Sequence, residues 1–213
     1  MAITYPLSLP TTVGIANIEF RAINSVATST SPFTFSSQVH AYSGQAWQVD
    51  VTLPPMSRDL AEVWVAFLIS LRGQFGTFYL GDPNATEARG SARDSTTIEL
   101  SKPAVVGSDN LVIEEKPLKN NENNYLRAGD YMHVANGDSR QLFKVLKDVN
   151  TKSNGTAEVD IWPAVRKKIN KGTPIVVKNP QGIFRLSSNE QSYSINDASL
   201  YGISFGAVEV ITV

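Results

Sequence analysis

The chain has 213 residues, 42% of them hydrophobic and 18% charged, and its formal net charge is −1 at pH 7. This length and apolar content suffice for one large β domain or two small ones, and the near-neutral charge gives no electrostatic argument for a nucleic-acid partner. Cysteine is absent, which excludes disulfides, thiolate catalysis and cysteine-based zinc sites and is compatible with assembly in a reducing cytoplasm.

The N-terminal segment is apolar at every second position. Ile3, Tyr5, Leu7 and Leu9 alternate with polar residues or proline. Two interpretations stay open: the segment packs on a neighbouring subunit, or it is an edge strand of its own domain. It lacks the basic region and long apolar run of a secretory signal, and the longest strongly apolar run, 63–69, is too short to cross a bilayer. We therefore expect a soluble protein, or part of one, without membrane insertion.

Alternating apolar and polar residues predict antiparallel strands in the first quarter of the chain. Residues 18–21 form one such run, and residues 33–41, which include Phe33 and Phe35, form another. We expect both to be half buried. A turn at 42–45 then leads to a strand with one apolar face, which completes a predicted hairpin. The residues of that face are Trp47, Val49, Val51 and Leu53.

Residues 58–72 form the single predicted helix. Ser57 is placed as its N-cap, while Arg72 and Gly73 suit its C-terminal end. Apolar residues recur along it at i, i+3, i+4, i+7, i+8 and i+11, which predicts a stripe that packs on a large surface. The stripe consists of Leu60, Val63, Trp64, Phe67, Leu68 and Leu71. An aromatic strand, 75–80, follows.

The composition changes after residue 83. Residues 84–97 are small and polar and are predicted to be a linker, and residues 119–124 are predicted to be a loop. Between them and beyond, short strands at roughly ten-residue spacing predict a small barrel. These strands are 96–100, 111–113, 131–134, 142–146 and 157–162.

The last part of the chain returns to longer alternating strands. The final one, 201–213, is too apolar to be left as a free edge, so we expect it to pair within the first domain. The predicted fold is therefore mainly β. A β-sandwich or split-barrel domain, residues 1–88 plus 179–213, carries the packed helix and is interrupted by an inserted small β-barrel domain, residues 89–178.

Candidate catalytic chemistry is sparse. His40 and His133 are the only histidines, and neither has a partner at metal-ligand spacing. No nucleophile elbow or phosphate-binding glycine loop is present. We expect structural histidines, a protein that is not an enzyme, and no catalytic, cofactor or metal site.

Six carboxylates and three tryptophans are further candidates for function. The sequence alone cannot place any two carboxylates at the separation that a glycosidase needs. Residues 114–116 are expected to be a solvated strand end, and the tryptophans Trp47, Trp64 and Trp162 are expected in the core. The carboxylates considered are Asp50, Asp82, Glu114, Glu115, Asp130 and Asp160.

Several segments together resemble the minor tail or distal tail proteins of long-tailed bacteriophages, and the resemblance covers most of the chain. None is a catalytic signature, so the specificity lies in their order and combination. The segments are Met1-Ala2-Ile3-Thr4-Tyr5-Pro6-Leu7-Ser8-Leu9-Pro10, 51–56, Trp64-Val65-Ala66-Phe67-Leu68, Gly76-Thr77-Phe78-Tyr79-Leu80-Gly81-Asp82-Pro83, 126–131, 143–145, 161–163 and 182–189.

The resemblance implies a structural protein of the virion tail that is assembled in the host cytoplasm. Such a protein forms a ring of copies of itself at the tail tip, with six copies as the family expectation, and joins the tail-tube protein to the hub, fibre or receptor-binding proteins. In this setting Ile3, Tyr5 and Leu7 are candidate subunit contacts. The basic cluster of Arg166, Lys167 and Lys168 is either solvated surface or a contact with an acidic partner or with genomic DNA in the lumen.

A second function remains open. Sandwiches and small barrels commonly carry ligand sites on their loops, so a carbohydrate-binding β module acting in host-surface recognition is the alternative. A glycan-degrading enzyme is a third and weaker interpretation.

Overall fold

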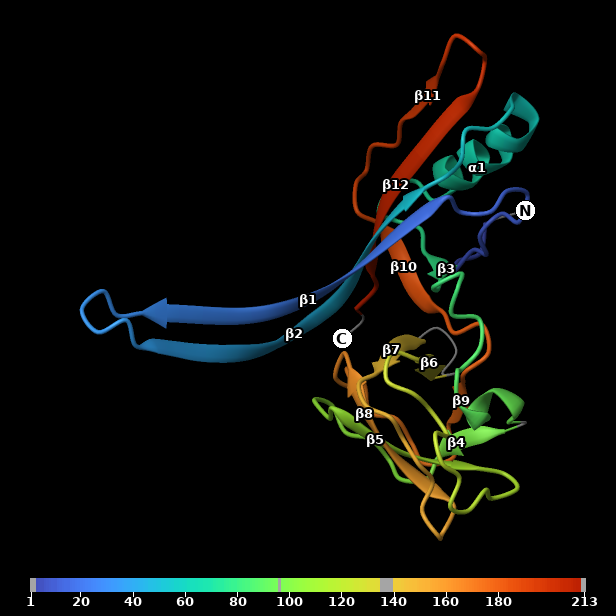
Figure 1. Ribbon diagram of the computed structural model, residues 1–213. Coiled ribbons are helices and arrows are strands. Elements are labelled where there is room, and N and C mark those ends of the chain that lie inside the picture. Colours follow the sequence, from blue (N-terminus) through green and yellow to red (C-terminus); the bar gives the residue numbers. More distant parts are fainter. Residues whose placement is uncertain (1–2, 96, 135–139, 212–213) are drawn as a thin grey trace.

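The computed structural model describes residues 3–95, 97–134 and 140–211. They form an open antiparallel sheet covered by one helix, and a separate closed barrel (Figure 1). The expected mainly β fold with one packed helix and a small barrel is confirmed.

The open sheet contains strands from both ends of the chain. Its strand order is β1-β2-β12-β10-β3, and β11 pairs with β12 outside this path. The bounds are β1 Asn17–Thr30, β2 Ser37–Thr52, β3 Phe78–Leu80, β10 Gly182–Leu186, β11 Tyr193–Ile195 and β12 Tyr201–Glu209. The last long strand, β12, therefore lies inside the sheet between β2 and β10, where its apolar side chains are covered.

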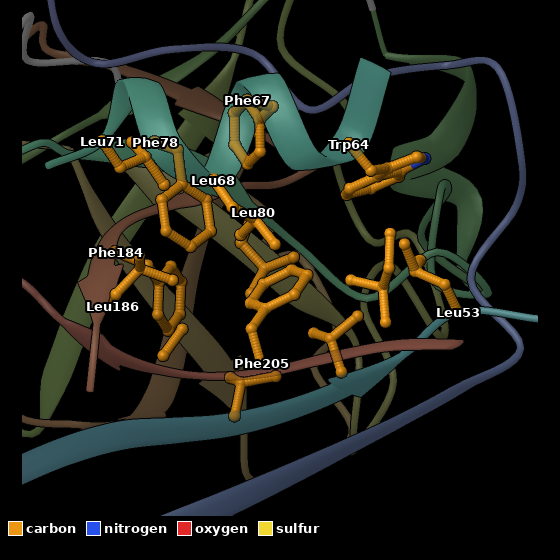
Figure 2. Packing of buried hydrophobic residues seen from close by; sticks show 14 of the residues in the cluster. Leu53, Trp64, Phe67, Leu68, Leu71, Phe78, Leu80, Phe184, Leu186 and Phe205 are labelled. Atoms are coloured by element: carbon orange, nitrogen blue, oxygen red, sulfur yellow. The ribbon is translucent and has the colours of Figure 1, made fainter. Parts of the chain in front are cut away.

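Helix α1, Arg58–Ser70, packs its buried face on this sheet (Figure 2). Trp64 lies against Phe205 of β12 with ring centroids 6.3 Å apart, and Phe67 meets Phe78 of β3 edge-to-face at 5.7 Å. Aromatic pairs of this kind add to the stabilisation from apolar burial. The helix thus joins β3 and β12, which are distant in the sequence, in one core.

The observed helix differs from the predicted one in its end and in its buried face. It ends at Ser70 instead of residue 72, because Arg72 and Gly73 both have positive φ angles, 52° and 65°. Leu60 and Val63 were expected in the stripe but are 39% and 42% exposed. Ala61 and Val65 are buried in place of Leu60 and Val63. The buried face consists of Ala61, Trp64, Val65, Phe67 and Leu68, followed by Leu71.

The start of the helix is where the sequence predicts it. Ser57 has the extended backbone of an N-cap, with φ −67° and ψ 161°, but its side chain makes no capping hydrogen bond.

The barrel is closed by six antiparallel strands and has its own apolar core. Their order around the barrel is β4-β5-β8-β7-β6-β9. The bounds are β4 Ile98–Leu100, β5 Asn110–Glu115, β6 Tyr131–Val134, β7 Gln141–Val145, β8 Thr156–Trp162 and β9 Pro174–Val176.

The segment expected to be a linker is instead packed on the barrel. It contains a short 3-10 helix, η1 Ser91–Asp94, and buries Ala88 and Ala92 in the barrel core. Gly90 is needed here, because a Cβ at this position would lie 2.3 Å from the carbonyl oxygens of Asn124 and Tyr125. Composition alone suggested a loose connection, whereas long-range packing makes the segment part of the barrel.

Candidate assembly surface

The most unusual feature of the molecule is a long hairpin that projects from the sheet (Figure 1). We call residues 22–45 of the β1–β2 hairpin the arm. Its strands pair with each other as far as Thr30↔Ser37, and every residue from 22 to 44 except Ser31 is exposed. With about ten residues per strand and roughly 3.3 Å per residue, the arm extends by roughly 33 Å.

The arm has no charged residues, and no other element of the described chain packs over it. Residues 22–49 contain no Asp, Glu, Lys or Arg. Exposed strand edges in natural proteins are usually protected by charged residues, by proline or by a covering element, because they otherwise pair with other chains. The arm instead exposes large apolar side chains, namely Ile23, Val26, Phe33, Phe35, Val39 and Tyr42. Exposed apolar patches rimmed by polar residues often mark interaction sites.

The tip of the arm presents two phenyl rings to solvent. Phe33 is 92% exposed and Phe35 is 83% exposed. The expectation that residues 33–41 are half buried is therefore wrong for the single chain. The turn is well defined: Ser31 N–H donates to the Ser36 carbonyl at 2.9 Å, and Phe35 N–H donates to the Ser31 carbonyl at 3.0 Å. Phe35 has a φ of 56°, a conformation that costs a bulky residue roughly 1 kcal/mol more than glycine.

The expected turn at 42–45 is also wrong, because these residues lie within β2. The register shifts there: Asn24 pairs with Gln45, but Val26 pairs with Ala41. The intervening residues form a bulge, a feature that bends and twists a strand. Gly44 fits the crowded position, since a Cβ there would lie 3.1 Å from Ser25 Cβ. A glycine and small polar residues are typical of turns and bulges alike.

Aromatic residues fix the base of the arm to the barrel. Trp47 of β2 donates its Nε1–H to the Leu142 carbonyl of β7 at 3.2 Å and meets Trp162 of β8 edge-to-face at 4.5 Å. Trp162 in turn donates its Nε1–H to Asn24 Oδ1 at 2.8 Å. Trp47 is buried, as expected for a core residue, whereas Trp162 is only half buried. The barrel therefore holds the arm at its root.

The three residues of the basic cluster lie in different environments. Arg166 lies inside the junction, where its Nη2 donates to the Gln45 carbonyl at 2.9 Å and to Glu209 Oε2 at 2.7 Å. The Glu209 side chain is only 1% exposed. Arg166 is thus a structural residue of the junction and not a free surface contact, whereas Lys167 and Lys168 are exposed.

The N-terminal segment packs against its own sheet. Leu7 N–H donates to the Thr77 carbonyl at 2.8 Å, and Tyr79 N–H donates to the Leu7 carbonyl at 2.9 Å, which covers the outer edge of β3. The Tyr5 hydroxyl donates to the Ser70 carbonyl at 2.6 Å. Of the two interpretations, the edge-strand one describes Tyr5 and Leu7. Ile3 is exposed and remains a predicted subunit contact.

The two histidines occupy different environments. His40 lies on the arm, with its ring 4.6 Å from that of Tyr42. His133 of β6 is buried, and its Nδ1 accepts a hydrogen bond from Gln181 N–H at 3.1 Å, next to β10. Burial, and secondarily the positive charge of Arg140, lowers the pKa of His133 to about 3. His133 is therefore neutral at physiological pH and helps to hold the barrel to the sheet.

This environment predicts acid sensitivity. The unfolded chain binds a proton at His133 near pH 6.5, whereas the folded protein does not until about pH 3, so stability decreases as pH falls through this window. Between pH 7 and pH 5 the loss from this residue should be about 2 kcal/mol. Urea unfolding at both pH values measures it. The H133N variant, whose Oδ1 can replace Nδ1 as acceptor, should show a smaller pH dependence; an unchanged dependence would contradict this account.

Each candidate carboxylate has its own partner, and only Glu114 and Glu115 share an element, strand β5. Glu115 was expected in a solvated strand end but is buried, and it accepts hydrogen bonds from Ser95 Oγ at 2.6 Å and pairs with Lys119 Nζ at 3.2 Å. Asp82 is a turn residue whose Oδ1 accepts a hydrogen bond from Asn84 N–H at 2.9 Å. The other pairs are Asp50 with Arg21, Glu114 with Ser101, Asp130 with Arg89 and Asp160 with Lys147.

Within residues 3–95, 97–134 and 140–211, no three His, Cys, Asp or Glu residues lie close enough together to hold a metal ion. In the same described part of the chain, the helix is too short to cross a membrane. No protein-family model and no curated protein matches this sequence.

Proposed function

We propose that the protein is a structural subunit of a bacteriophage tail tip. In this role it assembles through the arm into a closed ring, which joins the tail tube to the hub, fibre or receptor-binding proteins. The role requires no catalysis. The observation that carries the proposal is the arm itself, a long exposed hairpin that has no charged residues and ends in two solvent-exposed phenyl rings.

The backbone of the arm favours association with further copies. β1 is the edge strand of the sheet, and β12 pairs with β2 only along residues 48–52. Among the described residues, no strand pairs with the second edge of β2 at 37–44. The arm therefore offers two strand edges, and strand addition at such edges is a common mode of protein recognition. Two unlike edges on each subunit are what a head-to-tail ring needs.

The phage context rests on the resemblance of the sequence segments, and six copies remain the expectation taken from that family. The attachment of the sheet to the barrel supports the same role. Trp47, Arg166 and His133 hold the two parts together. A subunit that transmits contacts from the tube to receptor-binding proteins needs such a fixed connection between its parts.

Native mass spectrometry of the purified chain, alone and with tail-tube protein, tests the proposal. We expect one closed oligomer that binds the tube protein. The matched variant replaces residues 27–40 with Asn-Gly, so that Val26 and its partner Ala41 flank a two-residue hairpin turn. It should remain folded and monomeric. A concentration-independent monomer of the complete chain that ignores tail-tube protein would overturn the proposal.

A further inference from the structure

A polar pocket of about 400 Å³ opens on the barrel beside η1. It shares no residue with the arm or with the N-terminal segment. The residues that matter for its chemistry are Arg89, Arg93, Asp94, Asn123, Asn124 and Arg127.

The backbone around the pocket is held firmly. Ser91 N–H donates to the Asn124 carbonyl at 3.1 Å, and Ala92 N–H donates to the Tyr125 carbonyl at 2.9 Å, so η1 is fixed to the opposite wall. Gly90 allows this close approach, as described above. The walls of the pocket are therefore preformed and do not need to be ordered by a ligand.

Asp130 holds the side chain of Arg89 and the backbone of Arg127. Its side chain is buried, and it accepts hydrogen bonds from the backbone N–H of Arg127 at 2.9 Å and from Arg89 Nε at 2.9 Å. Arg89 Nη2 also donates to the Ala128 carbonyl. The guanidinium of Arg89 is thus held in place, and its charge is balanced by Asp130.

The guanidinium groups of Arg93 and Arg127 have fewer partners than that of Arg89. Arg93 forms only a long ion pair with Asp94, at 3.6 Å, and both side chains are mostly exposed. The Arg127 guanidinium has no hydrogen bond or ion pair with any part of the chain that the structure describes. The three arginines of the pocket therefore carry one more positive charge than Asp94 and the underlying Asp130 balance.

The arrangement selects a class of ligand. Guanidinium groups match carboxylates and phosphates through paired hydrogen bonds. The side-chain amides of Asn123 and Asn124 are exposed and can bond hydroxyl groups. None of the lining residues is aromatic, so the pocket has no surface on which a neutral sugar ring could stack.

We propose that this pocket binds a sugar residue that carries an oxyanion, either a carboxylate or a phosphate group. The oxyanion lies between Arg93 and Arg127, and the hydroxyl groups of the sugar bond Asn123 and Asn124. Binding is a property of the single subunit and does not require the ring.

Titration calorimetry of the complete chain with glucuronic acid, glucose 6-phosphate, glucose and inorganic phosphate tests the site and distinguishes the two anions. At least one acidic sugar should bind about tenfold or more tightly than glucose, the effect of one charge-assisted hydrogen bond. It should also bind more tightly than phosphate alone. Equal affinities for the acidic sugar and glucose, binding of phosphate only, or no binding would each overturn the proposal.

Charge variants make the test specific. R127Q should weaken binding of the acidic sugar by about tenfold or more, whereas D94N should strengthen it because a competing carboxylate is removed. R58Q, a change of the exposed Arg58 on α1, is the matched control and should have no effect. The variant with the shortened arm should bind the sugar normally, so failure of this site and failure of ring assembly are distinguishable. An equal loss in R58Q, or no response to D94N and R127Q, would refute the assignment.

Discussion

Replacing the two aromatic residues at the tip of the arm, with F33S and F35G together, should prevent the proposed ring from assembling and leave the single chain folded. Both phenyl rings are almost fully exposed, so they contribute little to the stability of the single chain. Burying a phenylalanine side chain in an interface contributes about 2 kcal/mol. Loss of both should weaken each contact by about 4 kcal/mol, or roughly a thousandfold in the association constant.

Sedimentation velocity measures the loss of assembly, and thermal unfolding monitors the fold. F35G should raise the melting temperature slightly, because glycine adopts the positive φ of this position without strain. The control is V105S with V106S, two exposed apolar residues in a barrel loop, which should assemble as the natural chain does. If the tip variant still forms the ring, or if the control loses it equally, the tip is not the contact.

R166A should destabilise the protein by about 3–5 kcal/mol, the usual cost of leaving one member of a buried ion pair without its partner. The carboxylate of Glu209, which is 1% exposed, would keep only the hydrogen bond from Trp47 N–H, at 3.2 Å. The bond from Arg166 to the Gln45 carbonyl at the base of the arm would also be lost. Urea unfolding followed by tryptophan fluorescence measures the change.

Two further variants separate this explanation from a general effect of surface charge. K168A removes a neighbouring exposed cation and should change stability by no more than about 0.5 kcal/mol. The double variant R166M with E209L should recover most of the loss, because it removes both charges and keeps apolar volume. Similar stabilities for R166A and K168A would mean that the buried pair is not important.

Much of the fold follows from local sequence patterns. Alternation at Trp47, Val49 and Val51 predicts the buried face of β2, and the short strands between turn residues predict the barrel. The apolar final strand predicts a place inside a sheet, which it has in β12. These patterns succeed because each one shows which face of a single strand or helix is apolar, and in these elements that face packs on the core of the same chain.

The arm shows where such patterns fail. Phe33, Phe35 and Val39 alternate in the same way whether their face meets the core of the same chain or another chain. The period of two shows which residues share a face but not what covers it. A different signal was present, namely the absence of charged residues from 22 to 49, which is unusual for a segment expected to have one solvated face.

The remaining misses involve contacts between distant parts of the chain. Glu115 is buried and accepts a hydrogen bond from Ser95, 20 residues earlier in the chain, and Arg166 is internal because Glu209 lies opposite it. The polar pocket likewise combines residues 89–94 with residues 123–127. No spacing rule in the sequence relates these positions, so only the folded chain brings them together.

The position of β12 beside β2 determines how the subunit resists a pull on the arm. Strand hydrogen bonds run perpendicular to the strands. A force along the β2 segment at its base therefore shears the pairs from Ser204↔Thr52 to Val208↔Gln48 together, instead of opening them one after another. The load passes from β2 into the middle of the sheet, where α1 and β10 support β12. A pull on the arm should therefore leave the pairing of β2 with β12 intact until several hydrogen bonds break together.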